Sequence, residues 1–159
     1  MLQTFSFFNG FDPFDRDRSS DYLLQSSSIQ GLFCFVNLTD LHLLSAVGID
    51  WDDATVTDIA RSWPHLERLE LGSMYGTRSP RTTLRCLEAF AQYSPRLTRL
   101  ALAFDATVIP TSSSQFSLDK LESLGVDASP ISKARPVAEL LAGIFPPQRC
   151  RHVGGCGGR

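Results

Sequence analysis

The stretch Trp63–Leu71, WPHLERLEL, returns in altered form as Ser94–Leu102, SPRLTRLAL. Both contain a proline followed by the pattern Leu-x-x-Leu-x-Leu. The pattern occurs twice more, at Leu38–Leu43 and, with a closing valine, at Leu121–Val126. The first leucines of successive copies are 28, 31 and 24 residues apart. This regular spacing indicates a structural unit that is repeated along the chain.

The alternation within each copy predicts a short β-strand, because successive side chains of a strand point to opposite sides. The leucines would then face one side and stack with those of neighbouring copies into a continuous core. The spacing is close to the ~20–29-residue period of leucine-rich repeats. We therefore expect parallel strands near residues 40–44, 68–72, 99–103 and 123–127.

The segments between the strands contain helical patterns. Helices are predicted near residues 53–62, 80–93 and 136–145, where apolar residues recur at spacings of three and four. Asp52 and Asp53 suit the start of the first helix, and Ser79-Pro80 reads as the N-cap and first residue of the second. Each predicted helix stops before a proline, which disfavours helical geometry in the residue preceding it. The polar stretch at residues 111–117, TSSSQFS, is predicted to be a loop.

Residues 35–146 resemble the leucine-rich-repeat region of F-box and F-box-like proteins of mushroom-forming fungi. The segments WPHLERLELGSMYGT and CLEAFAQYSPRLTRLAL carry most of this resemblance. It implies an α/β solenoid, with parallel strands on the concave face, helices on the convex face and ragged ends. In such proteins an N-terminal F-box binds the adaptor of a cullin ubiquitin ligase, and the repeats hold the protein to be ubiquitinated.

The chain is expected to divide into three parts. Residues 1–34 are expected to be a poorly ordered segment without a clear F-box, so that we expect no adaptor binding by this chain alone. Residues 35–146 form the repeat domain. Residues 147–159 are expected to be a disordered tail rich in glycine and arginine.

Composition excludes several classes of function. The formal net charge is −2, which gives no electrostatic reason to expect binding to nucleic acid or to an anionic membrane. No apolar run approaches the ~20 residues that span a bilayer, and the first residues do not read as a secretory signal. The four cysteines are too few for a disulfide scaffold. We expect a cytoplasmic or nuclear protein.

Three groups of residues suggest chemistry, and each has a simpler interpretation. Cys150, His152 and Cys156 offer three zinc-type ligands, whereas a structural zinc site needs four. Cys86 is a candidate nucleophile with His65 or His42, although its place in an apolar helical stripe favours burial. Asp50, Asp52 and Asp53 suggest a cation site, but helix capping accounts for at least two of them. The sequence therefore predicts no metal and no cofactor.

The residues between the leucines are the better candidates for a site. They would line the concave face, the usual binding surface of a solenoid; they are Asp40, His42, Arg68, Glu70 and Arg99. Their mixed charges favour a protein partner over nucleic acid. The sequence thus predicts a monomeric, non-catalytic protein-interaction module. The alternatives are a truncated repeat fragment without a specific partner and a cysteine-dependent hydrolase.

Overall fold

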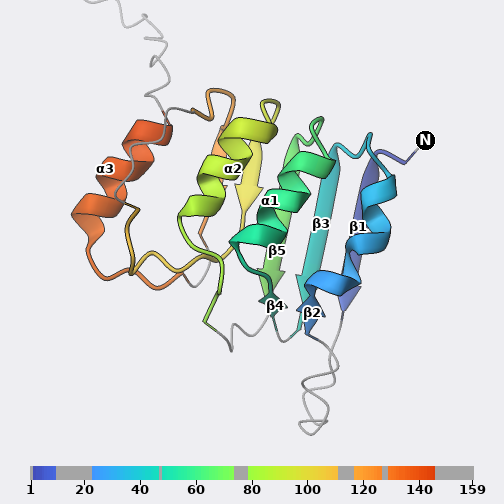
Figure 1. Cartoon of the computed structure of the whole chain (residues 1–159), viewed down its shortest axis with the longest axis horizontal. Coiled ribbons are helices and arrows are strands. Elements are labelled where there is room, and N and C mark those ends of the chain that lie inside the picture. Colours follow the sequence, from blue (N-terminus) through green and yellow to red (C-terminus); the bar gives the residue numbers. More distant parts are fainter. Residues whose placement is uncertain are drawn as a thin grey trace, which may run out of the picture.

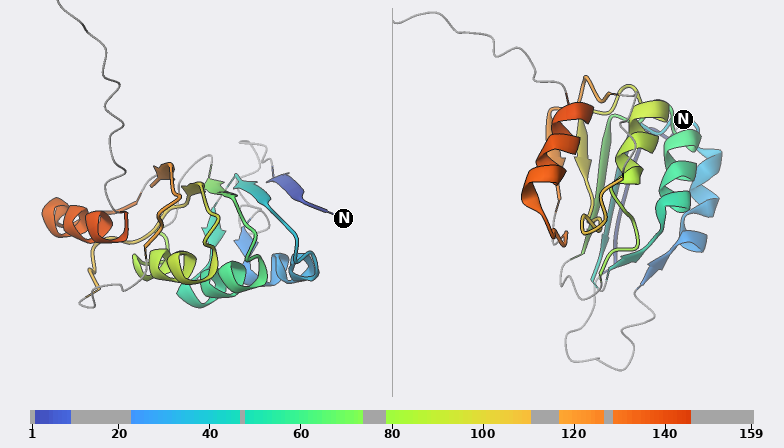
Figure 2. Two further views of the ribbon diagram at one scale, coloured as in Figure 1. Left: turned by 90° about the horizontal axis from the view of Figure 1, so that it is seen from above. Right: turned by 60° about the vertical axis from the view of Figure 1, so that its left-hand side comes forward.

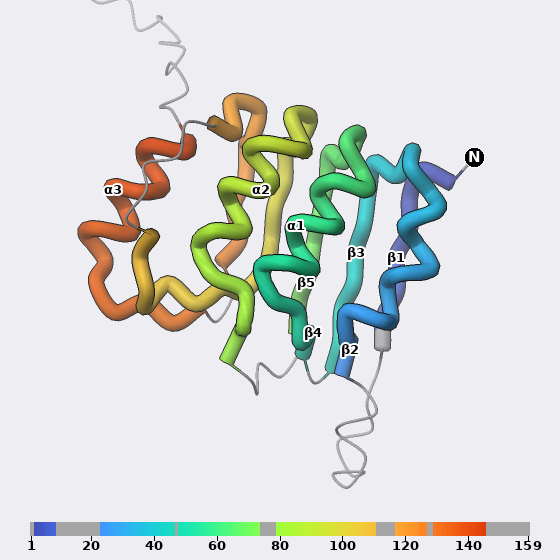
Figure 3. Tube along the Cα trace, in the orientation of Figure 1, coloured from blue at the N-terminus to red at the C-terminus, as the bar shows by residue number. Residues whose placement is uncertain are grey.

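A computed structural model describes residues 2–9, 23–46, 48–73, 79–110, 117–126 and 129–145. Its main feature is one parallel sheet of five strands in the order β1-β3-β5-β6-β7. These strands are β1 (Thr4–Asn9), β3 (Asp40–Ser45), β5 (Arg68–Ser73), β6 (Arg99–Ala101) and β7 (Ser123–Gly125). They lie side by side in chain order (Figures 1 and 3). The parallel pairing and the starts of the four predicted strands are confirmed, whereas β6 and β7 end two residues before the predicted ends, at Ala101 and Gly125.

The helices are gathered on one face of this sheet, and no described helix covers the other face (Figure 2). The α-helices are α1 (Asp53–Ser62), α2 (Arg85–Tyr93) and α3 (Ala134–Ile144). Two 3-10 helices, η2 (Ser26–Ser28) and η3 (Gln30–Cys34), precede β3, and the short strands β2 (Leu24–Gln25) and β4 (Ile49–Asp50) pair beside the main sheet. The molecule is thus a mixed α/β protein. We call the helix-free side of the main sheet the open face.

The leucines of the repeated pattern form the core between sheet and helices. Their strand positions are aligned across the sheet, with Leu41 opposite Leu69, Leu69 opposite Leu100, and Leu100 opposite Leu124. The leucines that precede the strands are also buried, at Leu38, Leu66, Leu97 and Leu121. Because each repeat places its apolar residues at the same depth, neighbouring repeats bury one another.

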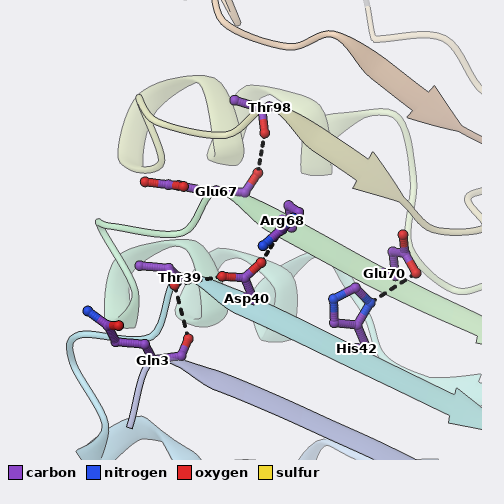
Figure 4. A network of polar contacts seen from close by, with 8 residues as sticks. All are labelled: Gln3, Thr39, Asp40, His42, Glu67, Arg68, Glu70 and Thr98. Atoms are coloured by element: carbon purple, nitrogen blue, oxygen red, sulfur yellow. Dashed lines mark hydrogen bonds and ion pairs between the residues drawn. The ribbon is translucent and has the colours of Figure 1, made fainter. Parts of the chain in front are cut away.

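The backbone repeats as regularly as the side chains. The carbonyl oxygen of Thr39 accepts hydrogen bonds from the backbone nitrogens of Glu67 and Arg68, at 2.8 and 3.0 Å. The carbonyl oxygens of Gln3, Glu67 and Thr98 each accept the same pair of hydrogen bonds from the next repeat. Figure 4 shows Thr39 together with these three residues. This ladder fixes the register with which each strand meets the next.

Strand β1 is a further copy of the pattern that sequence analysis missed. Thr4 is opposite Asp40, so that Leu2, Phe5 and Phe7 occupy the positions of Leu38, Leu41 and Leu43. Phenylalanine replaces leucine at two of the three positions, which hid the copy. The segment 1–34, which the sequence predicts to be poorly ordered, thus contains β1 and the elements between Leu24 and Cys34.

The helix boundaries show one further correction. Helix α1 begins and ends as predicted, and Asp52 caps it. Helix α2 begins at Arg85 rather than near residue 80. The preceding residues are extended instead, since Arg81 bridges to Asp52 and Thr83 bridges to Asp105. The Ser79-Pro80 pair therefore does not start this helix.

Two expectations lie largely or wholly outside the described residues. The predicted loop at 111–117 has only Ser117 described, and the tail at 147–159 is not described at all. Within the ranges that are described, no helix is long and apolar enough to cross a membrane.

Candidate functional site

The five predicted site residues lie together on the open face. They occupy strand positions that alternate with the buried leucines of β3, β5 and β6, so that their side chains point away from the helices. Two rows result. Asp40, Arg68 and Arg99 are neighbours in the first row, and His42 and Glu70 begin the second.

Asp40 and Arg68 form an ion pair between β3 and β5 (Figure 4). The side chain of Asp40 is only 7% exposed, whereas that of Arg68 is 49% exposed. The hydroxyl of Thr39 also donates to Asp40, at 2.7 Å. Burial alone would raise the pKa of Asp40, but the hydrogen bonds from Arg68 and Thr39 outweigh it and hold this pKa below its usual value. Asp40 therefore orients Arg68 and is not itself available to a partner.

His42 and Glu70 form the next cross-strand contact in the second row. The His42 Nδ1 atom lies 2.9 Å from a carboxylate oxygen of Glu70, and both side chains are partly exposed, at 30% and 45%. Figure 4 shows both on the side of the sheet away from the helices. Unlike Asp40, both remain accessible to a partner.

Arg99 differs from Arg68 although the two are adjacent on neighbouring strands. It is exposed, and within the described ranges no carboxylate lies within ion-pair distance of it. The one buried carboxylate of this row, Asp40, is already engaged by Arg68. Arg99 thus has guanidinium donors that a ligand carboxylate can use.

Two adjoining hollows extend from Arg99 across the open face. One, of about 330 Å³, is bordered by Arg99, Glu70 and Glu122. The other, of about 320 Å³, is bordered by Leu44 and Gly72. Glu70, Ala101 and Gly125 line both. The two hollows therefore adjoin each other, one with a charged border and the other with an apolar border, and we call them together the depression.

Small residues produce this depression. On β5, β6 and β7 the outward positions toward the ends of the strands hold Gly72, Ala101 and Gly125. A Cβ atom at Gly72 would lie 2.7 Å from the Leu44 side chain, and one at Gly125 would lie 3.0 Å from that of Ala101. Glycine at position 72 therefore lets Leu44 lie across the neighbouring strand. Ala101 and Gly125 are aligned with Glu70 across the sheet, whereas Gly72 lies one outward position further along β5.

The other candidate residues are placed differently. Cys86 is fully buried on α2, and this burial raises the pKa of its thiol, which disfavours the reactive thiolate. His42 lies on the opposite, open face of the sheet, and His65 lies in an exposed turn after α1. Nothing in this arrangement supports a nucleophilic site at Cys86.

The acidic residues near the start of α1 have structural partners. Asp52 accepts a hydrogen bond from the Thr55 nitrogen at 2.9 Å. Asp53 accepts one from the Thr83 nitrogen at 2.7 Å, and Asp50 pairs with Arg81 at 3.4 Å. The described residues contain no group of three or more potential metal ligands. Cys150, His152 and Cys156 lie outside the described residues.

Comparison with known proteins adds no assignment to this geometry. No protein-family model matches the chain, and no curated protein matches it.

Proposed function

We propose that this chain is a short leucine-rich-repeat solenoid that binds a polypeptide on the open face of its sheet and catalyses no reaction. The observation that carries the proposal is the pair of adjoining hollows over Gly72, Ala101 and Gly125, with Arg99 at the border of one of them. Sheet faces that no helix covers are the usual binding surfaces of solenoid proteins. The repeated leucine pattern and the parallel strands support the solenoid interpretation.

The borders of the depression favour a polypeptide ligand over a nucleic acid. The hollow that Arg99 borders is also lined by two carboxylates, Glu70 and Glu122, which disfavour the row of phosphates that a nucleic acid carries. A polypeptide can instead place a carboxylate at Arg99, whose planar guanidinium suits two parallel hydrogen bonds. An apolar side chain a few residues away would meet Leu44 at the other end. We therefore expect a segment in which an acidic residue is closely followed by an apolar one.

The resemblance to fungal F-box-like proteins gives this binding a biological setting. In those proteins the repeats hold the protein that a cullin ubiquitin ligase modifies. By that resemblance, the ligand of the open face would be a ubiquitination substrate. The proposal for the surface does not depend on this setting, because it rests on Arg99 and the adjoining depression.

The test uses peptides selected from a random displayed library on the immobilised wild-type chain. Their affinities are then measured by calorimetry for the wild type and for Ala101→Trp, which places a large side chain in the depression. Ala54→Trp is the matched control, because Ala54 is exposed on α1, on the helical face. We expect Ala101→Trp and Arg99→Ala each to weaken binding about 30-fold, the effect of losing a ~2 kcal/mol hot spot.

The Ala54→Trp control distinguishes the loss of a specific binding surface from a general loss of folded protein. Ala54→Trp is expected to bind as the wild type does, and thermal melting of all variants verifies that each is folded. Selected peptides that lose affinity for Ala54→Trp but not for Ala101→Trp would place the binding surface on the helices and overturn the proposal.

A further inference from the structure

The outer edge of the main sheet has apolar side chains where a protected edge would have polar ones. Strand β1 is at the end of the strand order, and its exposed fractions are 43% for Phe7 and 57% for Phe8. Leu2 is 37% exposed, whereas Leu38 at the equivalent place in the next repeat is fully buried. The residues of β1 thus match an interior repeat, but in the described structure only one side of β1 is covered.

In the described structure the backbone of β1 also pairs with a strand on one side only, which is β3. The Asp40 nitrogen donates to the Gln3 carbonyl oxygen at 3.0 Å, which sets the parity of the parallel ladder. In a parallel ladder, every second residue of a strand makes its backbone hydrogen bonds to the same neighbouring strand. The backbone N–H and C=O groups of residues 3, 5, 7 and 9 therefore face β3. The N–H and C=O groups of Thr4, Ser6 and Phe8 then point away from the sheet. No other described strand lies on that side.

Nothing in the sequence of β1 opposes pairing with another strand. Residues 2–9, LQTFSFFN, contain no charged residue and no proline. Natural edge strands are normally protected by such residues, because an unprotected edge invites a further strand. Two copies of this segment would bring no like charges together.

From these three observations we infer that β1 pairs antiparallel with β1 of a second copy of this chain. An edge that meets its own copy across a twofold axis satisfies both edges with a single contact. With the axis perpendicular to the sheet, the helices of both copies lie on the same side. Directly opposed residues share a face, so that Phe7 meets Phe5 or Phe7 of the second copy. The open faces stay uncovered and lie side by side.

A dimer differs from the monomer that the sequence predicted. That prediction was made without recognising the strand β1. It is independent of the proposed ligand, because no residue that borders the depression belongs to β1. A dimer would present two copies of the depression on one surface.

The experiment measures the molar mass of the full chain in solution by sedimentation equilibrium, for the wild type, Ser6→Pro and Ser6→Ala. The Ser6 nitrogen points away from β3, so that proline removes an outward donor while the ladder to β3 remains. We expect a dimer for the wild type and for Ser6→Ala. We expect the dimer of Ser6→Pro to be at least ~10-fold weaker, a change of ~1.4 kcal/mol, with unchanged circular dichroism.

Two results would overturn the inference: a wild-type chain that is monomeric at every concentration tested, or a folded Ser6→Pro variant that dimerises like the wild type. Should Ser6→Pro fail to fold, Phe7→Lys decides, because its charge would face the second copy at the same edge. A folded Phe7→Lys variant with wild-type dimer affinity would also contradict the proposed contact.

Discussion

Asp40, Arg68 and Arg99 occupy the same place in three successive repeats, but their partners give them different roles. Asp40 is buried and Arg68 covers it, whereas Arg99 is exposed and lies outside this pair. A charge that compensates a buried neighbour contributes to folding, and an uncompensated exposed charge is free for a ligand. Sequence alternation predicted that all three share a face. It did not predict the pairing, which depends on the register between strands distant in sequence.

The first prediction separates these roles by substitution. Arg68→Ala should lower the free energy of unfolding, because it leaves the Asp40 carboxylate buried without its cation. Arg99→Ala should change it by no more than about 0.5 kcal/mol, as is usual at exposed positions. Urea denaturation of both variants provides the measurement. Equal stability of Arg68→Ala and Arg99→Ala would show that the Asp40–Arg68 pair does not stabilise the fold.

The second prediction follows from the lowered pKa of Asp40. A carboxyl group whose pKa is lower in the folded state stabilises the fold above its unfolded pKa, and this contribution is lost as the pH falls through the folded pKa. Wild type and Asp40→Asn should therefore differ in stability at neutral pH. The difference should shrink below about pH 4, where Asp40 of the unfolded chain becomes protonated. Unfolding measured across this range would contradict the assignment if the difference grew on acidification.

Strands and helices were predicted well from the sequence where apolar residues recur at a regular spacing. Leucine at two alternating positions located β3, β5 and β6, and leucine followed by valine located β7. The residue before each proline marked the helix ends. Periodicity failed at β1, where phenylalanine replaces leucine. It failed again before α2, where Arg81 and Thr83 bridge to neighbouring segments. Such bridges are tertiary contacts, and no local signal announces them.

The third prediction tests the start of α1. The Asp52 carboxylate accepts from the Thr55 nitrogen, which satisfies one of the free donors of the first helical turn. Asp52→Ala should cost about 1 kcal/mol, within the usual range for the loss of an N-cap. Asp58→Ala is the control, since Asp58 is an exposed acid within the same helix. Chemical denaturation giving equal losses for the two variants would argue against a capping role.

The buried leucines join each copy of the pattern to its neighbours across the sheet. Leu69 is fully buried and lies between Leu41 and Leu100 on the adjacent strands. Each repeat thus depends on its neighbours, which is the property that makes repeat proteins cooperative. The same stacking creates the depression on the other side of the sheet. Small residues, Gly72, Ala101 and Gly125, form part of its lining, and the leucine pattern gave no indication of it.

The fourth prediction concerns this stacked core. Leu69→Ala should cost about 2–5 kcal/mol, because a cavity would remain in the middle of the leucine stack. Glu70→Ala, on the opposite side of the same strand, is the natural comparison and should cost less. Thermal and urea unfolding provide the values. A smaller loss for Leu69→Ala than for Glu70→Ala would be incompatible with a core between sheet and helices.

The proposed binding of a polypeptide to the open face of the sheet can be tested by nuclear magnetic resonance. A library-selected peptide is titrated into the isotopically labelled chain, and the backbone amide shifts are followed. Binding at the open face predicts the largest shifts in β5 and β6, at Glu70, Arg99 and Ala101, with little change in α1 and α2. Largest shifts in α1 and α2, with unaffected amides in β5 and β6, would contradict it.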